Sequence, residues 1–340
     1  MPVNHDPGPT RARARIESLD DAAAQPIAAG GGGLIRIGTA SWTDPTMTAA
    51  GVFYPVGADS AEERLQYYAS HFPVVEVDAT YYALPAVRTA ELWVERTPPD
   101  FIFNIKAHAL MTGQPTETKR LPKFIRDELP EALRAKARIY AKDLPEPLRE
   151  AIWSTFREGL APLAERSQLG SVLLQYPRWV FPSNENRAAI EEAAERLTGW
   201  RCAVEFRNGS WLNEKNAERT LSFLSDHDLA FVMVDEPQGF KSSVPPTVAV
   251  TSPDLAIVRF HGRNADTWEA RGITPAERFR YLYDRDELQE WVPRIRQAAT
   301  KARETFVLMN NCFSNYGTTN AREIAALLAD LRLPEDDPAG

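Results

Sequence analysis

Eight short apolar runs, separated by segments with helical periodicity, limit this chain to few architectures. The runs are rich in β-branched and aromatic residues, and their lengths suit strands that are buried on both faces of a parallel sheet. They occupy residues 34–38, 74–78, 101–106, 171–175, 200–206, 229–235, 255–260 and 305–310. The clearest helical patterns cover residues 61–70, 91–95, 186–198, 215–226, 285–301 and 320–331. This alternation predicts an α/β fold, a TIM (β/α)8 barrel in a single domain, with an open sheet of similar strand number as the alternative.

The two ends of the chain differ from this pattern. Residues 1–33 contain Pro, Ala and alternating arginines and end in four glycines, so they have little apolar surface to offset the entropy of ordering. We therefore predict a flexible tail over residues 1–33, a barrel domain over residues 34–333 and a frayed C-terminus over residues 334–340. A Pro-rich stretch over residues 121–148 is expected to form a long excursion after the third strand.

Composition narrows the classes of partner. The formal net charge of −8 disfavours broad binding to nucleic acid or to anionic membranes, although it leaves room for a local basic pocket. No apolar run approaches the length of a transmembrane helix, and the N-terminus lacks the apolar core of a signal peptide. Two cysteines, Cys202 and Cys312, are too few for a disulfide framework. We predict a cytoplasmic protein without membrane contact, and its oligomeric state stays open.

Nearly every predicted strand ends on a polar residue that is costly to bury, and in a barrel such ends converge on the face where active sites lie. We predict four catalytic residues there, namely Glu76, Lys106, Glu205 and His261. The predicted substrate-binding residues are Trp42, Asp78, Tyr82, Gln175, Arg207, Asp235, Arg259, Arg263, Asn310 and Asn311. His108, just past the third strand, is a weaker candidate.

Each of these residues has a structural alternative. Lys106 can extend its amine out of the barrel mouth, and Glu205 and Arg207, two residues apart on one strand face, can form a structural ion pair. A lone histidine such as His261 is usually a hydrogen-bonded core residue. Adjacent asparagines are common in turns and caps, and the aromatic candidates, Trp42 and Tyr82, are suited to packing.

Several motifs are missing from the sequence. It contains no G-x-G-x-x-G between a strand and a helix, no Walker-type phosphate loop, no H-E-x-x-H and no G-x-S-x-G nucleophile elbow. Five histidines, of which His261 alone ends a predicted strand, are a poor supply for a histidine-rich metal centre. We predict neither a metal site nor a cofactor.

The motifs of the chain resemble those of the YecE-like family, the domain of unknown function numbered seventy-two. The matching segments are GTASW at residues 38–42, FYP at 53–55, VEVDATYY at 75–82, FNIKA at 103–107, LQYP at 174–177, VEFR at 204–207, SW at 210–211, RFHGR at 259–263 and NN at 310–311. The resemblance covers residues 34–331 and implies a TIM-barrel fold. The chain has Asp78 where the family usually has Asn, Tyr81 in place of Phe, and Cys312 where an acid or histidine is common.

Four functions remain as hypotheses. The first is an enzyme, a hydrolase, lyase or isomerase, that acts on a small anionic or polyhydroxylated substrate, with Lys106, Arg207 and Arg259 binding anionic oxygens and with Glu205 and His261 exchanging protons. The second is a glycosidase-like hydrolase that uses Glu76 and Glu205. The third, by fold analogy alone, is a barrel that processes or binds nucleic acid, which the acidic balance disfavours. The fourth is a noncatalytic ligand-binding protein.

Overall fold

The structure is a computed structural model that describes residues 8–16, 19, 21–49, 51–331 and 333. The frayed C-terminus that we predict for residues 334–340 lies outside the described residues. Eight parallel strands form the barrel, and all eight were predicted from the sequence to within two or three residues at each end. They are β2 (Leu34–Thr39), β3 (Val74–Val77), β4 (Ile102–Lys106), β7 (Leu169–Tyr176), β8 (Cys202–Phe206), β9 (Ala230–Asp235), β10 (Leu255–Phe260) and β11 (Glu304–Met309).

The sheet is closed. Its strand order is β2-β11-β10-β9-β8-β7-β4-β3, and β2 pairs with β11 and also with β3. An open sheet has two unpaired edges, so this pairing excludes the open-sheet alternative and confirms the TIM-barrel fold. A ninth strand, β1 (Ile27–Ala28), joins β2 in antiparallel register from outside the barrel.

The contacts between residues divide the chain into two compact units. The strands of the single predicted barrel domain are therefore shared between two units. Residues 1–76 and 231–340 form the first unit, and residues 77–230 form the second. The helices of the first are α1 (Gly8–Ala14), α2 (Ala61–His71), α10 (Ala265–Trp268), α11 (Pro275–Arg278), α12 (Arg285–Gln289), α13 (Val292–Ala299) and α14 (Tyr316–Leu328). Those of the second are α3 (Ala79–Tyr82), α4 (Val87–Glu95), α5 (Lys123–Glu128), α6 (Glu131–Arg134), α7 (Glu146–Glu165), α8 (Asn184–Glu195) and α9 (Ala217–Asp226).

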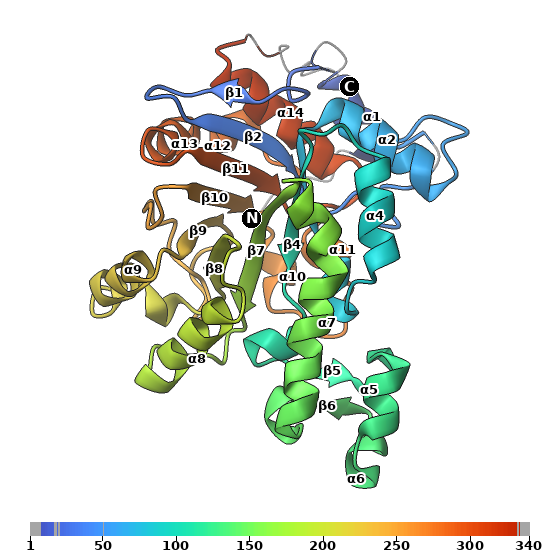
Figure 1. The fold of residues 1–340 in the computed structure, drawn as a ribbon. Coiled ribbons are helices and arrows are strands. Elements are labelled where there is room, and N and C mark those ends of the chain that lie inside the picture. Colours follow the sequence, from blue (N-terminus) through green and yellow to red (C-terminus); the bar gives the residue numbers. More distant parts are fainter. Residues whose placement is uncertain (1–7, 17–18, 20, 50, 332, 334–340) are drawn as a thin grey trace. The chain divides into compact units, whose positions relative to one another are not determined.

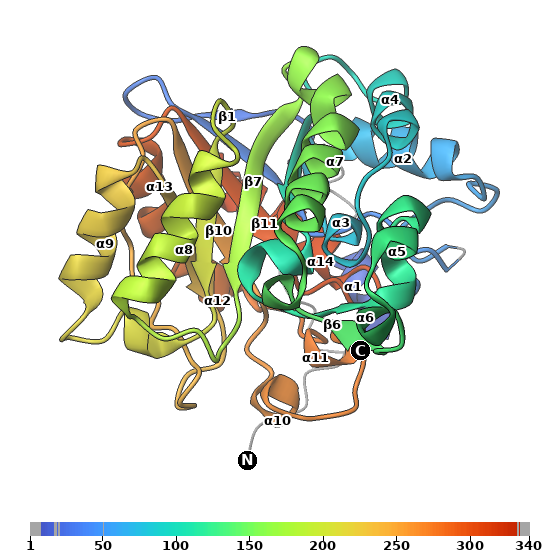
Figure 2. The same ribbon diagram turned by 60° about the horizontal axis from the view of Figure 1, so that its bottom comes forward.

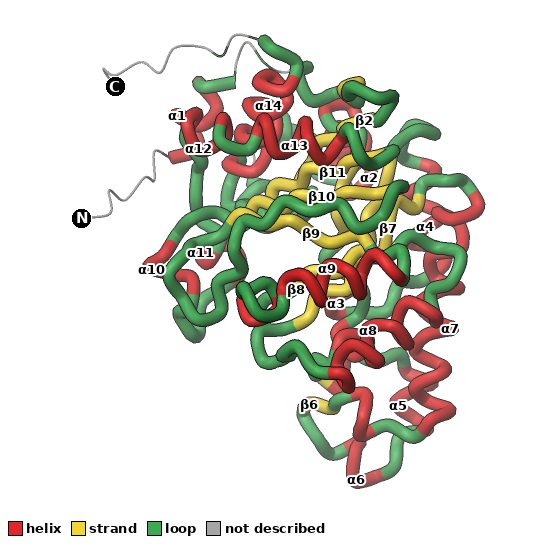
Figure 3. Tube along the Cα trace, turned by 90° about the vertical axis from the view of Figure 1, so that its left-hand side faces the viewer, coloured by secondary structure: helices red, strands yellow, loops and turns green. Residues whose placement is uncertain are grey.

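In the first unit, β2, β11 and β10 lie side by side, with α13 and α14 packed along β11 (Figures 1 and 3). Strands β2 and β3 approach each other closely at Gly38, where an added Cβ would lie 2.0 Å from the carbonyl oxygen of Val74. Only glycine is compatible with this contact. Helix α2 begins at a capping box in which Ser60 and Glu63 satisfy each other's backbone N–H groups.

The predicted flexible tail is wrong for the part of residues 1–33 that the structure describes. Helix α1 packs on α14, and Ala12 is fully buried in a cluster with Leu282 and Tyr316. Ile16 and Leu19 are also buried, and Arg15 forms an ion pair of 2.7 Å with Glu323. The segment has few apolar residues, but they fall at positions where each one is covered. Composition averaged over the segment could not reveal this.

The second unit contains the longest helix of the described chain, α7, which has 20 residues. The sequence analysis missed it, although its buried side chains, such as Leu148, Ile152 and Phe156, recur at helical spacing. Helix α7 packs against α4 (Figures 1 and 2). Strands β7 and β8 pair in parallel, with Gln175 opposite Glu205 near their carboxyl ends.

The Pro-rich excursion after β4 is folded. Residues 121–148 contain α5, α6, β6 (Arg138–Ile139), η3 (Ala141–Asp143) and the start of α7, and η1 (Ala109–Thr112), β5 (Thr116–Glu117) and η2 (Thr118–Arg120) precede them after β4. Strands β5 and β6 pair in antiparallel register, and α5 contacts α7. Prolines stand at the N-cap positions of α5, α6 and α7, where the missing N–H costs nothing.

Removal of residues 1–33 should destabilise the chain substantially. Burial of a side chain such as Ile16 or Leu19 contributes about 1.5–3 kcal/mol each, so we expect a loss of at least about 3 kcal/mol in the free energy of unfolding. Urea denaturation of the shortened chain measures it. The control is a chain that starts at Gly8, which keeps every contact described above. Equal stability of the full chain and the chain without residues 1–33 would contradict the packing of α1.

Candidate functional site

Six of the predicted site residues stand at the last or the penultimate position of their strands. In the second unit these residues are Lys106 on β4, Gln175 on β7 and Glu205 on β8, and in the first unit they are Glu76 on β3, Asp235 on β9 and Arg259 on β10. The remaining positions of β8, β9 and β10 are apolar and buried. These six candidates therefore stand at the carboxyl ends of their strands, whereas Asn104 on β4 and Ser171 on β7 are polar residues in strand interiors that hydrogen-bond to each other.

In the first unit, a buried ion pair joins β3 to β10. The Nη2 atom of Arg259 donates to Oε1 of Glu76, and each side chain is 1% exposed. The same Nη2 lies 3.3 Å from Oδ1 of Asn310, whose amide nitrogen lies 2.9 Å from Nδ1 of His261. These four predicted site residues thus form one connected group. The buried pair needs both partners, because loss of either would strand a charge away from water.

Asp235 is the centre of a second group in the first unit. Its carboxylate accepts hydrogen bonds from Arg263 at 2.8 and 2.9 Å, from the hydroxyl of Tyr283 at 2.7 Å and from Nε1 of Trp291 at 2.7 Å. Burial raises the pKa of Tyr283 well above its usual value, and the charge of Asp235 raises it further, so the phenol remains a donor. All these donors come from the protein, so the structure favours a structural role for Asp235 over ligand binding.

The turn after β10 is set by Gly262. Its φ is +82°, and an added Cβ would lie 2.6 Å from Cβ of Tyr281. The turn directs Arg263 toward Asp235, while the backbone N–H of His261 donates to the carbonyl of Asp235 at 2.8 Å. Asn311 is fully buried, and its amide nitrogen donates to the carbonyl of Tyr281 and to Asn320, which ties the loop after β11 to this turn.

In the second unit, Lys106 at the end of β4 is surrounded by residues of α3 and its N-terminus. Its Nζ lies 3.2 Å from Oδ1 of Asp78 and 5.0 Å from the ring centre of Tyr81. The Asp78 contact is an ion pair without the alignment of a hydrogen bond, and the two side chains are 14% and 33% exposed. Tyr82 packs edge-on against Tyr81 and is 43% exposed. Both side chains are thus partly accessible to solvent, although the Oδ1 atom of Asp78 that faces Lys106 is itself buried.

A second group in the same unit is centred on Glu205. Its fully buried carboxylate accepts from Nε2 of Gln175 at 2.8 Å and from Nη1 of Arg207 at 3.2 Å. Gln114, which the sequence analysis did not single out, links this group to Tyr81: it accepts from the Tyr81 hydroxyl at 2.8 Å and donates to the carbonyl of Gln175 at 3.1 Å. Gln114 lies in a loop without periodicity, so no local pattern marks it.

The other two candidates are packed inside their units. Trp42 is 7% exposed, and its carbonyl accepts from the buried hydroxyl of Tyr54. His108 is fully buried, and its Nδ1 accepts from the backbone of Leu110. Burial lowers the pKa of His108 from 6.5 to about 4, so its ring is neutral at pH 7. Its Nε2 has no hydrogen-bond partner among the described residues.

A pocket of about 830 Å³ lies in the second unit among η1, the start of α7, the segment after β7 and α8. Tyr140, Trp153 and Trp179 line it together with Arg149 and Arg196. Trp179 is 53% exposed. Amphipathic rings beside arginines are typical of sites for polar organic molecules. The described residues contain no group of three or more His, Cys, Asp or Glu side chains positioned to hold a metal ion.

The closed parallel topology defines a TIM-barrel protein, and its polar site candidates stand at the carboxyl ends of its strands. The chain belongs to the family described as "Protein of unknown function DUF72", whose model matches residues 36–339. This confirms the resemblance to the YecE-like family, which is the same family under another name.

Several relatives share both sequence and fold. The UPF0759 protein YunF of Bacillus subtilis is 30% identical over 298 residues, which are 87% of this chain and 95% of YunF. A DUF72 family protein of Thermotoga maritima is 29% identical, with a TM-score of 0.68 over 87% of this chain and 99% of that one. A DUF72 family protein of Enterococcus faecalis is 26% identical, with a TM-score of 0.67 over 88% and 98% of the two chains.

Among the described residues, no helix is both long enough and apolar enough to span a membrane.

Replacement of Asp235 by Ala should be costly. It leaves the buried hydroxyl of Tyr283 and the indole N–H of Trp291 without their acceptor, so we expect a loss of about 3–5 kcal/mol in the free energy of unfolding. The matched control is Asp254→Ala, which removes the exposed ion pair with Arg303 and should cost about 0–1 kcal/mol. Urea denaturation of both variants measures the difference, and similar small losses would show that the group around Asp235 is not structural.

The buried ring of His108 should make stability depend on pH. The folded chain holds it neutral down to about pH 4, whereas the unfolded chain binds a proton near pH 6.5, so this contribution is fully present above pH 6.5 and is lost as the pH falls toward 4. Between pH 7 and pH 5 the wild type should therefore lose about 1–2 kcal/mol more than His108→Gln.

The control for this measurement is His227→Gln. The pKa of His227 is raised by its hydrogen bond to the carbonyl of Phe223, with a smaller contribution from Glu191. The contribution of His227 to the free energy of unfolding depends on pH in the opposite sense. It is present at low pH and is lost as the pH rises through the raised pKa. Denaturation midpoints at pH 7 and pH 5 compare the three chains. An identical pH dependence of the wild type and His108→Gln would show that His108 is accessible to protons in the folded state.

Proposed function

We propose that this DUF72 protein is an enzyme that binds a small anionic or polyhydroxylated substrate at the carboxyl ends of its barrel strands. The observation that carries the proposal is the partly exposed, poorly aligned ion pair of Lys106 and Asp78 in the second unit. A charge pair that served stability alone would gain from alignment and from further donors, as Asp235 does in the first unit. An anionic group of a substrate would replace Asp78 as the partner of Lys106.

Glu205 is the proposed general base or acid. Its carboxylate is fully buried on β8, and Gln175 and Arg207 hold its Oε1 atom. Gln175 and Arg207 are themselves partly exposed, so both are proposed to contact substrate directly. In such a site the carboxylate exchanges a proton with the substrate while Arg207 binds developing negative charge.

Asp78 and Tyr82 supply specificity in this proposal. Asp78 places a carboxylate where relatives of the resembled family usually have an amide, so it accepts hydrogen bonds from substrate hydroxyls and repels anions that approach from its side. Tyr82 offers a half-exposed ring 4.9 Å from that of Tyr81. Together these groups suit a substrate that combines hydroxyl groups with one anionic group.

The first unit carries a separate candidate for proton transfer, His261, which is held by Asn310 at 2.9 Å. We assign Arg259 and Glu76 to its support, because their ion pair is almost completely buried. A carboxylate that is tied to a buried guanidinium is poorly placed to release and take up protons. This disfavours the glycosidase-like hypothesis, which requires such a role from Glu76.

The variant Lys106→Met tests the proposal. The Asp78 side chain is 33% exposed, so its carboxylate can turn toward water once the amine is removed, and the free energy of unfolding should stay the same or rise slightly. Affinity for the anions that bind the wild type should fall by about tenfold or more, because a charge-assisted hydrogen bond contributes about 1.5–3 kcal/mol. A thermal-shift screen with phosphate, sulfate, carboxylic acids, sugar phosphates and neutral sugars identifies ligands, and calorimetry then measures their affinity.

Lys301→Met is the matched control, since Lys301 is exposed and lies in the first unit. It should leave both stability and binding unchanged. Strong destabilisation of Lys106→Met with intact binding would make Lys106 structural and would contradict the proposed site. If ligands bind at Lys106 without turnover in the wild type, the protein is a noncatalytic binding barrel.

A further inference from the structure

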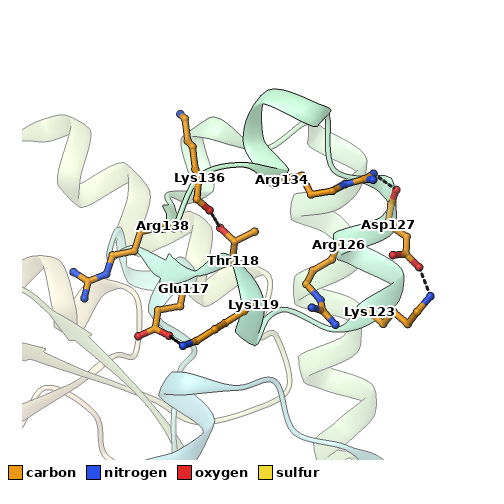
Figure 4. Close-up of a pocket in the computed structure, with 10 residues that line it drawn as sticks. Glu117, Thr118, Lys119, Lys123, Arg126, Asp127, Arg134, Lys136 and Arg138 are labelled. Carbon is orange, nitrogen blue, oxygen red and sulfur yellow. Dashed lines mark hydrogen bonds and ion pairs between the residues drawn. The ribbon is translucent and has the colours of Figure 1, made fainter.

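A second polar pocket lies in the excursion after β4, away from the strand ends considered so far. Its volume is about 690 Å³ (Figure 4). Six cationic side chains and two carboxylates line it, an excess of four positive charges in a chain whose net charge is −8. The cationic side chains are Lys119, Lys123, Arg126, Arg134, Lys136 and Arg138. We refer to these six residues and the space between them as the basic pocket.

The two carboxylates of the basic pocket already have partners. Glu117 lies 3.2 Å from Lys119, and Asp127 lies 2.6 Å from Lys123. A hydrogen bond to Lys119 lowers the pKa of Glu117, and a hydrogen bond to Lys123 lowers the pKa of Asp127. Two of the six cations are therefore neutralised within the pocket, and four are not.

The remaining cations have no carboxylate partner among the described residues. Arg134 donates to the backbone carbonyls of Asp127 and Leu129 and forms no ion pair with a carboxylate among the described residues. Arg126 is half-buried, and its Nε has no hydrogen-bond partner among the described residues. In Figure 4 the guanidinium of Arg126 lies between Lys119 and Lys123, inside the ring of cations. Lys136 and Arg138 are exposed, and in Figure 4 they lie on the other side of Thr118 from Arg126, with their charged ends pointing outward.

The backbone of the basic pocket is preformed. Strands β5 and β6 place Glu117 opposite Arg138, and the hydroxyl of Thr118 donates to the carbonyl of Lys136 at 2.5 Å. Ile125 and Leu129 anchor α5 by complete or nearly complete burial. Six cationic side chains line one pocket with two carboxylates, and because like charges repel, folding alone gives no reason to collect them. An anionic ligand would give such a reason.

We propose that the basic pocket binds a ligand with closely spaced phosphate groups, either a single-stranded nucleic acid or a free nucleotide. Arginine forks match phosphate oxygens in pairs, and four uncompensated charges exceed what a single carboxylate neutralises. Phe124 on α5, which follows Lys123 in the sequence, is 52% exposed and offers a ring on which a base can stack. This site is independent of the one at Lys106 and Glu205.

Net charge does not oppose this assignment. The acidic residues of the chain reduce attraction at long range, but at 0.15 M salt an exposed charge acts over about 8 Å. The local excess in the basic pocket therefore decides whether a phosphate binds there. The overall charge disfavours broad binding to nucleic acid but leaves room for a local basic pocket. The basic pocket is a candidate for such a site.

The experiment compares the full chain with a charge-reversed double variant, Lys136→Glu with Arg138→Glu. The probes are a fluorescein-labelled twelve-nucleotide oligothymidylate and ATP, with anisotropy or calorimetry as the measurement. We expect the wild type to bind at low salt with a slope of log affinity against log salt of about −3 for the oligonucleotide, which corresponds to four phosphate contacts. The double variant should bind at least about tenfold more weakly, with a slope reduced by about 1.4.

Two further variants make the test specific. Lys215→Glu with Lys301→Glu changes the net charge equally at exposed sites elsewhere and should leave affinity within about twofold. Arg126→Gln removes the unpaired guanidinium, so it should reduce affinity while the melting temperature stays the same or rises.

Binding of either probe that is lost in the pocket variants and kept in the control supports the proposal, and the probe that binds identifies the source of the phosphates. Two outcomes overturn it: neither probe binds the wild type at low salt, or both double variants lose affinity equally. Activity at the other proposed site is not part of the readout, so failure here leaves the function proposed for Lys106 and Glu205 untouched.

Discussion

Burial of the parallel strands on both faces governs where this protein can hold polar groups. Every residue of β9 and of β10 is buried, so a charge in either strand needs a partner that is also buried. The partners are found near the carboxyl ends, where loops and helix starts bring in side chains such as Tyr283, Trp291 and Asn310. Away from these ends, a charge on a strand is compensated where a neighbouring strand supplies the partner, as Glu304 at the start of β11 does for Arg36 on β2.

The two units compensate their charges to different degrees. In the first unit, Asp235 receives donors from three side chains, and Arg259 and Glu76 are almost fully removed from water. In the second unit, Asp78 and Lys106 meet without alignment and stay partly exposed. A charge whose partners all come from the protein favours stability, whereas a charge that is only partly paired can still bind a ligand. This contrast is why the proposed function rests on the second unit.

The barrel could be predicted because strands that are buried on both faces appear in the sequence as apolar runs. The ends of these runs also located Glu205, Asp235 and Arg259 at strand ends. The sequence could not reveal their partners, since the bond of Gln114 to the carbonyl of Gln175 joins segments 61 residues apart. It also failed for α1 and α7. Ala12 is buried by residues distant in sequence, and Ile16 is also buried. The prolines before α7 suggested a loop, so the helical spacing of the residues that follow them was overlooked.

Composition says little about local contacts. A low share of apolar residues was taken to indicate a free tail, and a negative net charge was taken to disfavour broad binding to nucleic acid, yet both are averages over many residues. A helix is held by the few side chains that it buries, and a ligand is held by the charges within a Debye length of it. Arg126 illustrates the point: its surroundings contain more cations than the neighbouring carboxylates neutralise, whatever the rest of the chain carries. Local geometry, which composition does not contain, therefore decides both questions.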